Sequence, residues 1–368
     1  MRSQAALARR AAACALVPVT AALLLLVLAA PAHAHGRGSD ATNYDSSITA
    51  VPELPGVAWE IYGGDELLGV TNDSDIELMV YGYEVGGELE QYARVGPDGV
   101  FVNANARATY ENTDRYAQVR IPTDAQIGGE PDWEQVSSGT SFAWHDHRMQ
   151  WMAPTPPPAV TDQSAETVVF PEWEVPFRYD GVDRALTGEL VWVPGPSPWP
   201  YLAVALLLVL PALAGLRTRP VDGRWPGLVR PAAVVLALVV AVNLTHLVDD
   251  LFYAPFDVVA KASAAVQTVL FLGIGAFGAL RGWQARDGAF TALGVGAGAV
   301  VVGQGLLYAS ALGASQNASL LPELVSRTVV AVSLAQALPL AVVAVLGTRA
   351  LLLPPEASAP SQAADAHA

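Results

Sequence analysis

The stretch Trp199-Pro-Tyr-Leu-Ala-Val-Ala-Leu-Leu-Leu-Val-Leu210 divides the chain into two parts of different character. It opens the first of five apolar stretches, which lie at about 199–216, 231–248, 263–280, 289–312 and 325–348. Each stretch is close to the ~20 residues that a helix needs to cross ~30 Å of hydrocarbon. We therefore expect an all-α bundle of five transmembrane helices over residues 196–353.

The residues before this stretch, 35–195, have the pattern of an antiparallel β domain. Short runs rich in Val, Ile, Tyr and Trp, such as 76–83 and 186–193, alternate with turn signals such as Gly86-Gly87 and Asp180-Gly181. Seven to nine such runs, with no clear amphipathic helix, predict a mainly-β sandwich of immunoglobulin-like or cupredoxin-like kind.

The first 34 residues have the composition of a secretory signal peptide. A positively charged start is followed by an apolar run over 11–30 and by Ala32-His-Ala34, an A-x-A cleavage signal. The only cysteine, Cys14, lies inside this segment, so the mature protein has no disulfide. We expect the β domain to be exported.

Arginine placement predicts the orientation of the five helices. The first and third loops between the apolar stretches carry the arginines, and the even loops carry aspartate and glutamate with few cations. The positive-inside rule then places the β domain outside and the C-terminus in the cytoplasm of a multi-pass cell-membrane protein. The last residues, 354–368, are rich in Ala, Ser and Pro and are expected to be a disordered cytoplasmic tail.

The predicted β domain is strongly acidic. Residues 35–195 carry 27 Asp and Glu against 8 Arg, a net charge of −19 before histidine is counted. Such a field repels nucleic acid and attracts cations, so we exclude a nucleic-acid partner and expect a lipid bilayer and cations instead. An acidic solvated surface without any bound metal would show the same composition.

Histidine and methionine gather in Ser141-Phe-Ala-Trp-His-Asp-His-Arg-Met-Gln-Trp-Met152, which has two of the six histidines. If this segment is a β-strand, His145, His147 and Met149 point to one face and Asp146 to the other. Two imidazoles and a thioether form a ligand set for a soft or borderline metal, with copper the first candidate, and Met149 and Met152 suit Cu(I). The alternative is a Trp-rich strand whose histidines make structural hydrogen bonds.

The predicted cleavage site adds a further candidate ligand. A cut after Ala34 leaves His35 at the amino terminus, where its amine and imidazole can together chelate Cu(II). A cut after Ala32 leaves His33-Ala-His35, which also chelates Cu(II). Histidine after such a signal can equally be a tolerated residue with no function.

These residues carry a resemblance to a known family. An exported β-sandwich with His35 at its mature start and an Asp/His pair at Asp146 and His147 resembles the CopC-type copper-resistance proteins, which in some high-GC bacteria are fused to a membrane domain. The resemblance implies copper binding at His35, Asp146 and His147, with His145 as an extra ligand. The family pair is usually Asp-x-His, whereas this chain has His145-Asp-His147, and its β domain is longer.

Within the apolar stretches, one group of ionisable residues stands out. His246, Asp249 and Asp250 have the i, i+3, i+4 spacing that places them on one helix face. Ionisable groups at membrane depth are costly and indicate a functional site, so they are candidates to accept a cation or relay protons. The alternative is a water-exposed helix end.

The expected function is membrane-anchored copper binding and handling, with the ion passed on to the membrane domain or exchanged with a donor or acceptor protein. No G-x-S-x-G, H-E-x-x-H or Walker motif occurs, so we expect a protein that is not an enzyme. Two alternatives remain open at this point. One is a structural or assembly protein that binds a partner without metal, and the other is a proton-coupled transport subunit.

Overall fold

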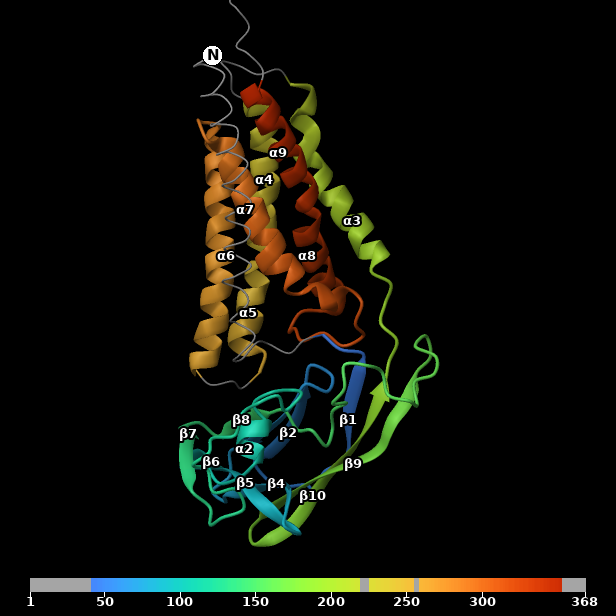
Figure 1. The fold of residues 1–368 in the computed structure, drawn as a ribbon, viewed down its shortest axis with the longest axis vertical. Helices are drawn as coiled ribbons and strands as arrows, with labels where there is room; N and C mark the ends of the chain where they lie inside the picture. The colour runs from blue at the N-terminus through green and yellow to red at the C-terminus, as the bar shows by residue number, and fades with distance from the viewer. Residues whose placement is uncertain (1–40, 219–224, 255–257, 353–368) are drawn as a thin grey trace, which may run out of the picture.

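The computed structural model describes residues 41–218, 225–254 and 258–352. It consists of a β domain and a helical domain, one stacked on the end of the other (Figure 1). The predicted signal peptide, His35 and the predicted tail at 354–368 lie outside the described residues.

The β domain contains two antiparallel sheets. The larger has the strand order β1-β10-β9-β4-β5-β6-β7 and the smaller has the order β2-β3-β8. The strands are β1 (Tyr44–Ala50), β2 (Val57–Tyr62), β3 (Leu67–Asn72), β4 (Leu78–Val85), β5 (Glu88–Gly96), β6 (Gly99–Asn103), β7 (Trp133–Ser137), β8 (Ser141–Trp144), β9 (Thr167–Tyr179) and β10 (Val182–Trp192). One four-residue helix, α2 (Ala108–Glu111), follows β6.

The two sheets share one hydrophobic core. Leu68 and Trp144 of the smaller sheet pack in the same buried cluster as Val80, Phe177 and Leu186 of the larger one. Burying a large apolar side chain of this kind contributes about 1.5–3 kcal/mol. The mainly-β part of the fold prediction is confirmed, with ten strands in place of seven to nine.

The hairpin of β9 and β10 shows where the strand prediction was wrong. Two of the short runs that predict separate strands, at 167–170 and 173–175, both belong to the single strand β9 of 13 residues. The ladder with β10 absorbs the irregularity through register shifts on either side of Leu190. The predicted turn is confirmed, because Asp180 and Gly181 both have positive φ, as a tight two-residue hairpin requires.

Within the described residues, the helical domain has five helical stretches long and apolar enough to cross a membrane: Trp199–Arg217, Pro226–Phe252, Val258–Gln284, Ala289–Leu306 and Glu323–Leu346. The elements are α3 (Trp199–Val209), η2 (Leu210–Arg217), α4 (Pro226–Val242), α5 (Leu244–Phe252), α6 (Val258–Gln284), α7 (Ala289–Val300), η3 (Val301–Leu306), η4 (Ala309–Leu312), α8 (Glu323–Ala335) and α9 (Ala337–Leu352). The number of apolar stretches agrees with the prediction, as expected for a membrane-spanning chain.

Backbone contacts join the two domains. Thr42 and Gln316 exchange both N–H···O bonds, at 3.1 and 2.8 Å, in an isolated antiparallel bridge. The Ser315 N–H donates to the Asn43 side chain at 2.8 Å, and the Tyr253 hydroxyl accepts from the Gly63 N–H at 2.7 Å. The β domain is therefore docked on one end of the helical domain.

Candidate functional site

The segment that carries His145 and His147 lies after the end of a strand and not within it. Strand β8 ends at Trp144, and the chain then turns, with the Met149 N–H donating to the Asp146 carbonyl at 3.1 Å. His145, His147 and Met149 therefore do not alternate along a strand face, because the strand that this arrangement requires ends before them. Met149 is fully buried in the shared core, while Met152 is half-buried.

Asp146 lies at the centre of a buried ion pair. Its carboxylate accepts hydrogen bonds from the Arg148 guanidinium at 2.6 and 2.8 Å and from the Trp144 indole at 2.9 Å. Burial opposes its ionisation, but the charge and hydrogen bonds of Arg148 outweigh burial and lower the pKa of Asp146. The oxygens of Asp146 are thus occupied by Arg148 and Trp144.

His145 is held by the turn that precedes β3. Its Nδ1 lies 2.8 Å from the Glu66 carbonyl oxygen and 3.6 Å from the Glu66 carboxylate. The Gln150 amide also donates to that carbonyl. Burial lowers the pKa of His145 to about 4, so the ring is neutral at pH 7. A neutral imidazole is the form that binds metals.

His147 is held by the segment after α2. Its Nε2 lies 3.0 Å from the Asp114 carbonyl oxygen, and its ring stacks on Tyr83 with centroids 5.9 Å apart. The His145 N–H donates to the Asn112 carbonyl at 3.2 Å, two residues before Asp114. The two histidines are therefore anchored on the same short segment.

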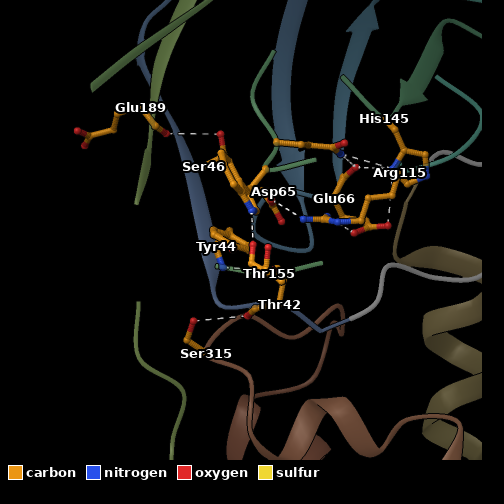
Figure 2. Close-up of polar contacts among 12 residues, drawn as sticks. Thr42, Tyr44, Ser46, Asp65, Glu66, Arg115, His145, Thr155, Glu189 and Ser315 are labelled. Carbon is orange, nitrogen blue, oxygen red and sulfur yellow. Dashed lines mark hydrogen bonds and ion pairs between the residues drawn. The ribbon is translucent and has the colours of Figure 1, made fainter. Parts of the chain in front are cut away.

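A charged cluster adjoins His145. Arg115 pairs with Asp65 at 2.5 Å and with Glu66, and all three side chains are nearly buried (Figure 2). Burial opposes the charge of Arg115, but the two carboxylates outweigh it and raise its pKa, so this group stays charged. The cluster places two carboxyl groups and one guanidinium next to a neutral imidazole, and burial raises the pKa of Asp65 although Arg115 opposes this.

A pocket of about 200 Å³ opens beside this cluster. Thr42 and Tyr44 line it together with Glu66 and Arg115, and Figure 2 shows these residues close to the loop that carries Ser315. Its remaining lining is aromatic and proline-rich, with Tyr116, Trp151, Pro154, Pro156 and Trp192. The pocket thus lies where the described chain begins, beside the junction of the two domains.

This position bears on His35. Five residues lie between His35 and Ala41, which lines the pocket, and the six Cα-to-Cα steps span at most about 20 Å. Among the described residues, no three or more His, Cys, Asp and Glu side chains are grouped so that they could hold a metal ion. A metal site on His145 and His147 therefore needs a further ligand.

Glu66, Arg115 and Gln150 were not singled out in the sequence. The pair Asp65-Glu66 follows Gly63-Gly64 and has the composition of an exposed turn. Arg115 is 49 residues away from Glu66 in the chain, so no local pattern joins them. The one available signal was the excess of acidic over basic residues in this domain. A buried pair of carboxylates needs a cation, so one of the few arginines could be expected to pair with two acidic side chains.

The ionisable group in the helical domain does not form one cluster. His246 of α5 stacks on Tyr308 with centroids 4.2 Å apart. Asp249 accepts hydrogen bonds from the Ser319 hydroxyl and the Leu320 N–H, and Asp250 accepts from the Thr268 hydroxyl at 2.6 Å. The three residues share a helix, but each contacts a different neighbouring segment.

Comparison with known proteins adds no relative: no family model, curated protein or solved structure matches this chain.

Proposed function

We propose that the protein is a membrane-anchored metal-binding protein, with copper as the first candidate. In this proposal His145 and His147 of the β domain bind the ion together with the amino-terminal segment that carries His35. The β domain lies on the outer side of the membrane, where the acidic field draws cations toward it. No catalytic step is required.

The observation that supports this proposal is the way in which both rings are held. Each imidazole has one nitrogen against a backbone carbonyl, Nδ1 of His145 on Glu66 and Nε2 of His147 on Asp114. Metal-binding histidines are commonly oriented by such a hydrogen bond, which fixes the tautomer and leaves the second nitrogen with its lone pair. The low pKa of His145 keeps proton competition small.

The test is a Cu(II) titration of the purified full-length protein, followed by calorimetry and electron paramagnetic resonance. We expect one tight site with nitrogen coupling in the wild type. His145→Ala and His147→Ala should each weaken binding at least ten-fold, and His35→Ala should do the same if the amino-terminal segment supplies the further ligand.

The matched control is His367→Ala, the same chemical change in the C-terminal sequence, which should leave the affinity unchanged. If His145→Ala and His147→Ala both bind copper as the wild type does, the proposed site is wrong. Titration with Zn(II) on the same variants compares the two metals.

A further inference from the structure

Three of the membrane-spanning stretches are interrupted along their length. Asn243 separates α4 from α5, Gln336 separates α8 from α9, and α7 continues into the π-helical turn η3 around Gln304. Pro339 lies just after Gln336 and cannot donate a helical hydrogen bond, which accounts for that break. Irregular backbone at membrane depth is tolerated where it is buried in protein or lines a hydrated cavity.

A polar side chain marks each of these interruptions. Asn243, Gln304 and Gln336 are all fully buried. The Asn243 side-chain amide donates at 2.8 Å both to the Val239 carbonyl, which also accepts from the Asn243 backbone N–H, and to the Ser333 hydroxyl of α8. The interruption at Asn243 is thus hydrogen-bonded to α8, the helix that ends at the interruption at Gln336.

Packing around η3 shows which way Gln304 faces. Gly303 lies against Phe271 of α6, and on the other side of the turn Gly305 lies against Leu334 of α8. The intervening residue, Gln304, therefore faces between these helices. Tyr308, four residues on, stacks on His246 of α5. The contacts of His246 with Tyr308, of Gly305 with Leu334 and of Asn243 with Ser333 join these segments, and Gln304, His246 and Gln336 each lie within about one helical turn of such a contact.

Buried polar atoms of His246, Gln304 and Gln336 have a common feature. Among the described residues, no protein group hydrogen-bonds to the buried Nε2 of His246, Oε1 of Gln304 or Nε2 of Gln336. An unpaired buried polar group is destabilising, so these atoms require another hydrogen-bond partner. Internal water, with two to four hydrogen bonds per molecule, supplies donors and acceptors of this kind.

We propose that His246, Gln304 and Gln336 form a hydrated site in the helical domain that binds and releases a proton at His246. Protonation adds one proton to the neutral imidazole, and release restores the neutral ring, so no oxidant or co-reactant takes part. The site does not depend on metal binding by the β domain, and interrupted helices are a general means of building ion sites within membranes.

The charged groups of the same half of the domain are paired with other residues. Asp249 and Asp250 of α5 are bonded to Ser319 and Thr268. From α8, Arg327 pairs with Glu323 at 2.6 Å and donates to the carbonyls of Ala311 and Ala314. Further ionisable groups of the packed elements are Lys261 and Arg281 on α6, Tyr253 after α5, and the phenol of Tyr308, which is in ring contact with His246.

Proton flux tests this proposal. Full-length protein in liposomes, with an enclosed pH-sensitive dye and a metal chelator, receives a potassium diffusion potential. We expect the wild type to conduct protons at least ten-fold faster than protein-free liposomes. His246→Gln keeps the hydrogen-bonding groups but cannot be protonated, and Gln304→Leu removes the acceptor. Each should reduce the flux at least ten-fold.

The matched control is Gln284→Leu at the exposed end of α6, which should conduct as the wild type does. Thermal unfolding of every variant shows that it is folded. Wild-type flux no greater than that of protein-free liposomes overturns the proposal, and so does wild-type flux in His246→Gln or in Gln304→Leu. Because the chelator removes free metal, failure here is distinct from failure of the copper titration.

Discussion

At the scale of single residues, burial decides what each ionisable side chain does. Asp146 and Arg148 form a buried pair in which removal of either partner leaves the other charge uncompensated, at a cost of about 3–5 kcal/mol. His145, beside them in the chain, has only backbone and amide partners and the Glu66 carboxylate at 3.6 Å, so burial dominates and the ring stays neutral. Asp146 and Arg148 are therefore charged, whereas the adjacent His145 is neutral.

This neutral His145 predicts acid sensitivity. Because its pKa is about 4 when folded and 6.5 when unfolded, its contribution is fully present above pH 6.5 and is lost as the pH falls through 4. By linkage, about 2 kcal/mol is lost by pH 5. His145→Gln keeps a donor for the Glu66 carbonyl without titrating, so its melting temperature should fall less than that of the wild type between pH 7 and pH 5. Equal falls would contradict the buried, neutral assignment.

At the scale of elements, the packing of β10 between β1 and β9 requires a glycine at position 188. Gly188 pairs with Ile48 of β1 and Trp173 of β9, and a Cβ there would collide with the Trp173 ring and the Ser47 carbonyl. The indole can lie over the strand only because this position is a glycine. The edge strand β1, which leads to the candidate site, depends on that packing.

Gly188→Val should therefore destabilise the β domain. We expect a loss of roughly 3 kcal/mol, because overpacking of this kind forces side chains and backbone to shift. Urea unfolding followed by tryptophan fluorescence measures the change. Gly139→Ala is the control: the new Cβ would meet only the Ser137 hydroxyl at 3.4 Å, so its stability should change by less than about 0.5 kcal/mol.

At the scale of the whole molecule, one loop of the helical domain joins the two proposed sites. The segment after η3 carries Tyr308, which stacks on His246, and continues to Gln316, which pairs with Thr42 beside the pocket of the β domain. Arg327 donates to three carbonyls of this loop, those of Ala311, Ala314 and Ser315, and so holds it in place. This loop therefore contacts both domains.

An engineered disulfide tests this docking. Residues that exchange both N–H···O bonds across an antiparallel bridge have Cα atoms about 5.5 Å apart, within the range that a disulfide spans. In a Cys14→Ser background, Thr42→Cys with Gln316→Cys should therefore form a disulfide on mild oxidation, seen as a mobility shift on a non-reducing gel. Thr42→Cys with Thr328→Cys is the control and should not. No disulfide in the first pair would contradict the docked arrangement.

The sequence by itself determined the features that depend on local composition. Five apolar stretches and the alternating β runs are short-range patterns, and the structure has five long apolar helices and two antiparallel sheets in the same regions. The turn at Asp180-Gly181 was also predictable, because positive φ is a local requirement.

Only the tertiary structure decided how the candidate site is built. His145 contacts a carbonyl 79 residues away in the chain and His147 one 33 residues away, so no local pattern identifies these partners. The sequence left open whether a strand continues through 141–152, and in the structure it ends at Trp144, after which Asp146 and Arg148 pair with each other in a buried turn. Local periodicity predicts elements, whereas burial, and with it the protonation and pairing of each side chain, depends on packing between distant segments.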